Sequence, residues 1–163
     1  KFIIFRDSFG DAYTNTQTLT DQPMPDRRDS WAAAENIIPA ASGAAKALAF
    51  VWPDLKVTGK AYRVPVRTGS IVELNAIVSR ATTRDEIVSA FQNAAVEPAW
   101  AGVLGVLEDE WASARIVGET RSCIVDLPLT QVLGDDLVSV AAWYDNEMGY
   151  STRLAELALK LSS

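Results

Sequence analysis

The stretch "DAYTNTQ", residues 11–17, gathers side chains that could hold a small anion. The stretch holds Thr14 and Thr16 together with a tyrosine, an asparagine and a glutamine, and Arg27 and Arg28 follow it; all of these side chains can donate hydrogen bonds. Hydroxyl and guanidinium groups both donate to phosphate oxygens, so these residue types favour an anion site. Asp11 is the carboxylate of the stretch, and it could take part in chemistry there. We expect it instead to cap or solvate the end of a loop.

Composition limits the function classes that the chain can serve. The 163 residues are 48 % apolar and 22 % charged, which suits one domain with a real core. A net charge of −6 argues against nucleic-acid or membrane partners, which require a basic surface. The single cysteine, Cys123, allows no internal disulfide, and we expect a cytoplasmic protein. The sequence has no histidine, which excludes a histidine base and makes a metal site improbable.

Periodicity and capping signals predict the secondary structure. We find no repeat or linker and expect one domain over residues 1–163. Thr83 and Glu86 form a capping-box pattern ahead of an apolar stripe. Helices are predicted over 29–39, 42–53 with Ser42 as cap, 82–95, and at the end of the chain where Leu154, Leu157, Ala158 and Leu161 align. Strands are predicted over 1–5, 60–66, 70–79, 101–107, 113–117, 122–127 and 137–145.

The long polar segment from Asp7 to Asp29 exceeds a simple connection, and loops of that length are usually functional. Strands dominate the rest of the chain, with few helices between them. This pattern favours an α+β fold with a mixed, mainly antiparallel sheet covered by helices on one face.

Four stretches resemble a known family in order and spacing. They are "ENIIPAASGAAKAL", "AYRVPVRTGSIVEL", "SCIVDLP" and "AWYDNEMGYSTRLAEL". Together they are similar to the C-terminal catalytic domain of bacterial-type phosphorylating glyceraldehyde-3-phosphate dehydrogenase, from about Ala12 to about Leu161. The resemblance implies a mixed sheet of about eight strands. It also implies a parent enzyme that uses NAD and that carries a nucleotide-binding Rossmann domain and a nucleophilic cysteine. Neither the Rossmann domain nor that cysteine is found in these residues.

The resemblance gives Asp11 a specific meaning. In the family a histidine that serves as general base stands directly before the segment that matches "AYTNTQ", and here Asp11 holds that position. An aspartate has a reference pKa of about 3.9 against about 6.5 for histidine, so near neutrality it is a weak base and cannot act as the acid. We therefore expect no catalytic residue in this chain.

The resemblance implies binding roles for other positions. Thr14, Thr16 and Arg63 match residues that hold the substrate's terminal phosphate, and Ser42 and Gly43 match the inorganic-phosphate site. Asn146 and Tyr150 match residues that contact nicotinamide. Simpler roles remain open: Ser42 as a helix cap, Arg63 as the partner of an acid and Tyr150 as a core residue. We expect Arg27 and Arg28 to be exposed and Cys123 to be an inert buried thiol.

Two functions remain possible on sequence. We favour an isolated, catalytically incomplete domain derived from the dehydrogenase, truncated and engineered, that binds phosphate or sulfate weakly and needs no cofactor. The alternative is a fragment of an active NAD-dependent enzyme of glycolysis whose missing parts come from another segment or chain. In either case the resemblance makes a homo-oligomer possible.

Overall fold

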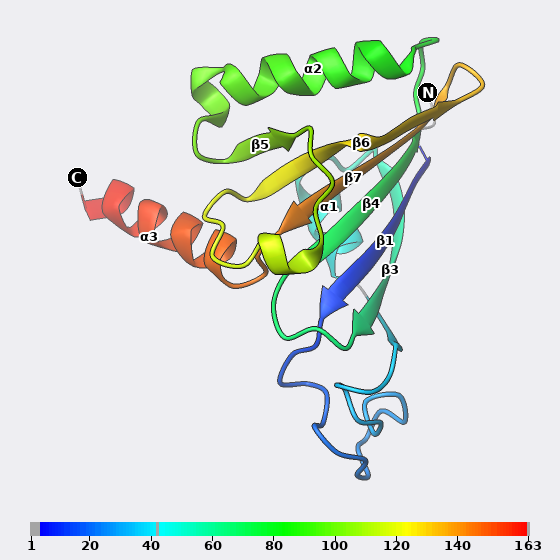
Figure 1. Cartoon of the computed structure of the whole chain (residues 1–163), viewed down its shortest axis with the longest axis vertical. Helices are drawn as coiled ribbons and strands as arrows, with labels where there is room; N and C mark the ends of the chain where they lie inside the picture. Colours follow the sequence, from blue (N-terminus) through cyan, green and yellow to red (C-terminus); the bar gives the residue numbers. More distant parts are fainter. Residues whose placement is uncertain (1–3, 42, 163) are drawn as a thin grey trace.

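A seven-stranded mixed sheet organises the computed structural model, which describes residues 4–41 and 43–162. Its strands are β1 (Ile4–Ala12), β2 (Ile38–Ala41), β3 (Lys56–Val64), β4 (Ser70–Ile77), β5 (Leu104–Leu107), β6 (Cys123–Leu133) and β7 (Leu137–Tyr144). The helices are α1 (Ala44–Val51), α2 (Arg84–Val96) and α3 (Met148–Ser162), with short 3₁₀ turns η1 (Pro98–Trp100) and η2 (Ser113–Arg115) (Figure 1).

The strand order is β2-β3-β1-β4-β7-β6-β5. Strand β1 runs parallel to β3 and β5 runs parallel to β6, while the other four pairings are antiparallel. The expected α+β fold with a mixed, mainly antiparallel sheet is therefore confirmed, with seven strands against the expected eight or so. Strand β1 lies inside the sheet, which places its C-terminal end between the ends of β3 and β4.

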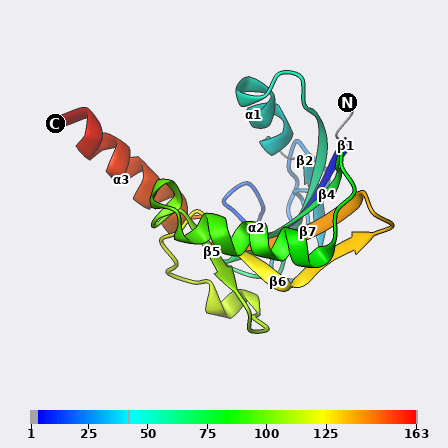
Figure 2. The same ribbon diagram turned by 90° about the horizontal axis from the view of Figure 1, so that it is seen from above.

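Helices α1 and α2 lie on the same side of the curved sheet (Figure 2). Val88 and Phe91 of α2 pack against the sheet residues Val125, Leu127 and Ala142. This confirms the predicted single helical face. The other face of β5 and β6 is covered by the segment that contains η2, because Ile116 and Trp111 pack there with Leu107, Ile124 and Trp143. Helix α3 extends away from the sheet (Figures 1 and 2).

The predicted capping box of α2 is present. The Thr83 hydroxyl accepts a hydrogen bond from the Glu86 backbone N–H, and the Glu86 carboxylate accepts one from the Thr83 N–H. Both bonds satisfy N–H groups that the first helical turn leaves without partners. The bond that the Thr83 N–H donates to the Glu86 carboxylate, followed in effect by one from the Thr82 hydroxyl, lowers the pKa of Glu86.

Two predicted elements are wrong, and the strand predicted over 1–5, whose first three residues lie outside the described part of the chain, continues as β1 to Ala12 into the segment expected to be a loop. Residues 29–39 form turns that lead into β2, because side chains bind the loop backbone instead of continuing a helix: Asp21 Oδ1 accepts from Ala32 N at 2.8 Å. Strand β2 then pairs with β3. Residues 113–117 contain η2 instead of a strand, and Ile116 behind it is fully buried.

Helix α1 begins after Gly43, which makes no side-chain cap bond, and Ser42 lies outside the described residues. No helix of the described chain is long and apolar enough to cross a membrane.

Candidate functional site

A cavity of about 440 Å³ lies where β1, β3 and β7 end and α3 begins. Its lining residues are Asp11, Arg63, Ser122, Tyr144, Asp145, Asn146, Gly149, Tyr150 and Arg153. The cavity therefore brings together Arg63, Asn146 and Tyr150, three of the residues singled out from sequence, with Asp11. A larger cavity of about 530 Å³ on the open face of the sheet contains none of them.

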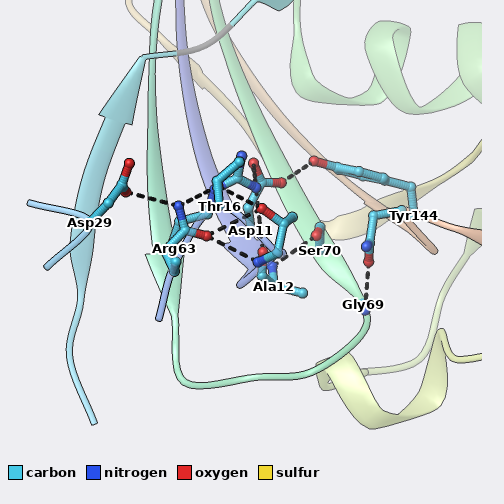
Figure 3. Close-up of polar contacts among 11 residues, drawn as sticks. Asp11, Ala12, Thr16, Asp29, Arg63, Gly69, Ser70 and Tyr144 are labelled. Atoms are coloured by element: carbon cyan, nitrogen blue, oxygen red, sulfur yellow. Dashed lines mark hydrogen bonds and ion pairs between the residues drawn. The ribbon is translucent and has the colours of Figure 1, made fainter. Parts of the chain in front are cut away.

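Asp11 is the centre of the site's polar contacts (Figure 3). Register pairs it with Arg63 of β3, and its Oδ2 lies 2.9 Å from Arg63 Nη1 in an ion pair. Its Oδ1 accepts a short hydrogen bond from the Tyr144 hydroxyl at the end of β7. The expectation of a solvated loop end is wrong, because pairing with β3 and β4 carries the strand up to this residue.

The environment of Tyr144 keeps it protonated. Burial, together with the hydrogen bond and negative charge of Asp11, raises its pKa well above the usual range. The phenol therefore serves as a hydrogen-bond donor near neutrality. Sequence reasoning missed this residue, although the "AWYDNE" stretch that carries it was part of the family resemblance.

The ion pair matches one of the simpler roles left open for Arg63. Its Nη1 also donates to the Ala12 carbonyl at 3.4 Å. The side chains of Asp11 and Arg63 are 14 % and 21 % exposed, so the pair is mostly shielded from water. Arg63 Nε is buried and has no partner among the described residues.

Thr14 and Thr16 lie just beyond this pair and do not line the cavity. Their hydroxyl oxygens are 2.9 Å apart, and Gln17 Nε2 donates to Thr16 Oγ1 at 2.7 Å. The same Nε2 donates to Asp29 Oδ1 at 3.0 Å (Figure 3). The buried Gln17 thus connects both threonines to Asp29 at the other end of the loop. Gln17 was not assigned a role from sequence, and its position in "DAYTNTQ" was the signal that could have identified it.

Asn146 and Tyr150 lie on the α3 side of the cavity. Asn146 Oδ1 accepts a hydrogen bond from the Gly69 N–H at 3.1 Å, which ties the start of α3 to the turn before β4. Tyr150 is 71 % exposed, so the reading of it as a core residue is wrong. Its ring is free to contact a ligand or another segment.

Asp145 sets the direction of α3. It is buried, and its carboxylate accepts hydrogen bonds from the N–H groups of Gly118, Glu147 and Met148. Burial works against ionisation of Asp145, but these three donors outweigh it and lower its pKa. The charged carboxylate is therefore committed to the backbone.

The remaining candidates lie away from the cavity. Gly43 is exposed and does not line it. Arg27 and Arg28 are exposed, as predicted. Cys123 is half-buried at the start of β6, and burial raises the pKa of its thiol. Over residues 4–41 and 43–162, no group of acidic, cysteine or histidine side chains is arranged to hold a metal ion.

Comparison with known proteins identifies the family. A family model described as "Glyceraldehyde 3-phosphate dehydrogenase, C-terminal domain" matches residues 11–146. "Glyceraldehyde-3-phosphate dehydrogenase 2" of Streptomyces avermitilis is 48 % identical over 150 residues, which cover 91 % of this chain and 44 % of the relative.

"Glyceraldehyde-3-phosphate dehydrogenase" of Borreliella burgdorferi is 46 % identical over 153 residues, covering 92 % of this chain and 46 % of the relative. The chain thus spans less than half the length of these curated relatives. It belongs to the glyceraldehyde-3-phosphate dehydrogenase family and corresponds to the C-terminal domain of that family.

Proposed function

We propose that this chain is a glyceraldehyde-3-phosphate dehydrogenase C-terminal domain that has lost the general-base step while keeping a polar cavity for ligands. The observation that carries the proposal is the commitment of Asp11: one carboxylate oxygen accepts from Arg63 and the other from Tyr144. A general base must reach the proton that it removes, within about 3 Å. The Asp11 carboxylate instead faces two residues of its own chain.

The only thiol of the chain adds to this argument. Cys123 packs in the apolar cluster beside Val125 and Leu127, under α2, and does not line the cavity. Burial raises its pKa, which favours the unreactive thiol over the thiolate. Among the residues that the structure describes, no general base and nucleophilic thiol lie together in the cavity.

Two residues that line the cavity offer contacts for the nicotinamide end of NAD, the cofactor that the family resemblance implies. Asn146 accepts from Gly69 through Oδ1, which leaves its Nδ2 group to donate to a carboxamide oxygen. The exposed Tyr150 ring offers a surface for a flat ring. NAD would supply hydride acceptance there, while Asn146 and Tyr150 would orient it.

The decisive experiment measures NADH formation with glyceraldehyde-3-phosphate, NAD and phosphate. We expect no turnover from the chain or from Asp11→His, because a histidine without a thiolate in reach has nothing to deprotonate. The Streptomyces avermitilis relative serves as the positive control. NADH above the no-enzyme control, in a preparation that mass spectrometry shows to be free of host dehydrogenase, would overturn the proposal.

A second candidate function is that of a part of an active enzyme, favoured by the chain covering only 44 % of its relative. To separate the two, the chain and Asp11→His are each mixed with the amino-terminal part of that relative. If only Asp11→His then forms NADH, the loss of the base step in this chain is supported. Turnover with the unaltered chain would establish the active-fragment reading instead.

We also infer weak, millimolar binding of phosphate or sulfate near Thr14, Thr16 and Arg63. Two hydroxyl groups and a guanidinium group supply donors of the kind that phosphate oxygens accept. A phosphate titration followed through backbone amide signals tests this. Signals of residues 11–17 that do not move would count against the site.

A further inference from the structure

We propose that Asp11 is a built-in anion that occupies Arg63 and so reduces the affinity of the cavity for anionic ligands. This inference rests on the proposed anion site and names the residue that controls it. In this chain, the preference of the site for anionic or neutral ligands depends on the Asp11 carboxylate of β1 as well as on Arg63.

The geometry of the sheet carries the first step. Parallel pairing of β1 and β3 places Asp11 directly opposite Arg63, so the 2.9 Å contact joins neighbouring strand positions. Neither side chain has to extend from a flexible loop to make it. Because both backbones are fixed by the sheet, the contact costs little conformational entropy and persists in the ligand-free protein.

The second step concerns Tyr144, which orients the carboxylate. Its hydroxyl donates to Oδ1 while Arg63 Nη1 donates to Oδ2. The carboxylate is therefore held from both sides, and it cannot turn away from Arg63 without breaking the Tyr144 bond. An incoming phosphate must compete with an acceptor that is already aligned.

The third step is that the cavity's other charged groups are also engaged. Arg153 Nη1 donates to the Gly102 carbonyl at 2.9 Å and its Nη2 donates to Glu156 at 2.7 Å. The Asp145 carboxylate is held by three backbone N–H groups. Both arginines among the described lining residues, Arg63 and Arg153, therefore already donate to an acceptor. Removing the Asp11 charge is the direct way to make Arg63 available to a ligand.

The test compares inorganic phosphate binding by Asp11→Asn and by the unaltered chain at constant ionic strength, with chloride as the balancing anion. Asparagine keeps the size of the side chain and removes its charge. We expect the dissociation constant for phosphate to fall on the order of tenfold, the change that one charge-assisted hydrogen bond can produce. Amide signals at Ala12 and Arg63 report binding at this site.

Three further variants make the result specific. Asp135→Asn removes the same charge from an exposed residue of the turn between β6 and β7, which does not line the cavity, and it should leave the affinity within about twofold because long-range charge effects are screened. Asp11→Glu retains the charge and should show no tenfold gain. The double variant Asp11→Asn with Arg63→Gln should lose the gain. Equal gains in Asp11→Asn and Asp135→Asn would overturn the proposal, as would no gain in Asp11→Asn.

Thermal unfolding guards against a variant that is merely destabilised. Asp11→Asn leaves the guanidinium without its counter-ion, so we expect a lower Tm without phosphate and a larger phosphate-induced rise in Tm than the unaltered chain shows. Tyr144→Phe loosens the Asp11 carboxylate but keeps its charge, so its phosphate-induced rise in Tm should be smaller than that of Asp11→Asn; an equal rise would refute the charge argument. Failure of this inference is distinguishable from failure of the proposed phosphate site. If phosphate moves no amide signals in any of these proteins, the site itself fails, whereas equal phosphate affinities in the unaltered chain and Asp11→Asn count against the role of Asp11 alone.

Discussion

Substituting Gly69 by alanine tests how tightly the turn before β4 is built. Gly69 has a φ of +93°, and an added Cβ would lie 2.7 Å from both the Ser113 carbonyl oxygen and Ile116 Cγ2. A left-handed conformation costs a non-glycine residue about 1–2 kcal/mol. Overpacking against a fixed backbone adds about 1–3 kcal/mol. Gly69→Ala should therefore lower the free energy of unfolding by about 2–5 kcal/mol.

Gly134 provides a matched control, because its φ is +64° and nothing lies within 4 Å of an added Cβ. Gly134→Ala should cost only the conformational part, about 1–2 kcal/mol. Urea unfolding followed by the fluorescence of the five tryptophans measures both variants. Equal losses in the two variants would show that the close approach of Ser113 and Ile116 has no energetic weight, and would refute the reasoning.

Two other substitutions test local electrostatics and capping. The Arg121 side chain donates to both oxygens of Glu119 at 2.8 and 2.9 Å, and this bond lowers the Glu119 pKa from 4.5 to about 2. Glu119→Gln should therefore lower the free energy of unfolding by about 1 kcal/mol at pH 7, a value kept small because the partly exposed Arg121 is screened by solvent. The difference in unfolding free energy between the variant and the unaltered chain, measured by urea unfolding, should vanish as the pH falls from about 5 towards 2. Thr83→Ala removes the α2 cap and should cost about 1 kcal/mol in the same assay, whereas exposed Ser89→Ala should change stability by less than about 0.5 kcal/mol; equal effects would contradict the capping argument.

Helix α2 shows which features could be predicted from sequence. Its cap, its apolar stripe and its end are all encoded within the same stretch of chain, so local rules were sufficient. Residues 29–39 show the opposite case. Their small and apolar residues suggested a helix, but β2 forms because β3, whose paired residues lie 19 to 25 positions further along the chain, offers hydrogen-bond partners. Local propensity is a weak guide where a sheet edge competes for the same backbone.

The candidate site divides in the same way. Resemblance identified Asp11, Arg63, Asn146 and Tyr150, and the structure places all four around one cavity. It could not give the partners of Asp11, because Arg63 lies 52 positions away in sequence and Tyr144 lies 133 positions away. Such contacts depend on strand register, which no short stretch of sequence specifies.

Strand register also links the two proposals made for this cavity. Asp11 lies opposite Arg63 across the β1–β3 pair, and Tyr144 lies opposite Ser70 across the β4–β7 pair. The Ser70 hydroxyl accepts a hydrogen bond from the Ala12 backbone N–H. The backbone at the end of β1 is thus held from both neighbouring strands, whatever side chain follows. A histidine there would leave Arg63 without this carboxylate, whereas an aspartate neutralises it. On the two proposals made above, the residue at this one position controls both proton transfer and the attraction of an anion, and we expect the two properties to change together.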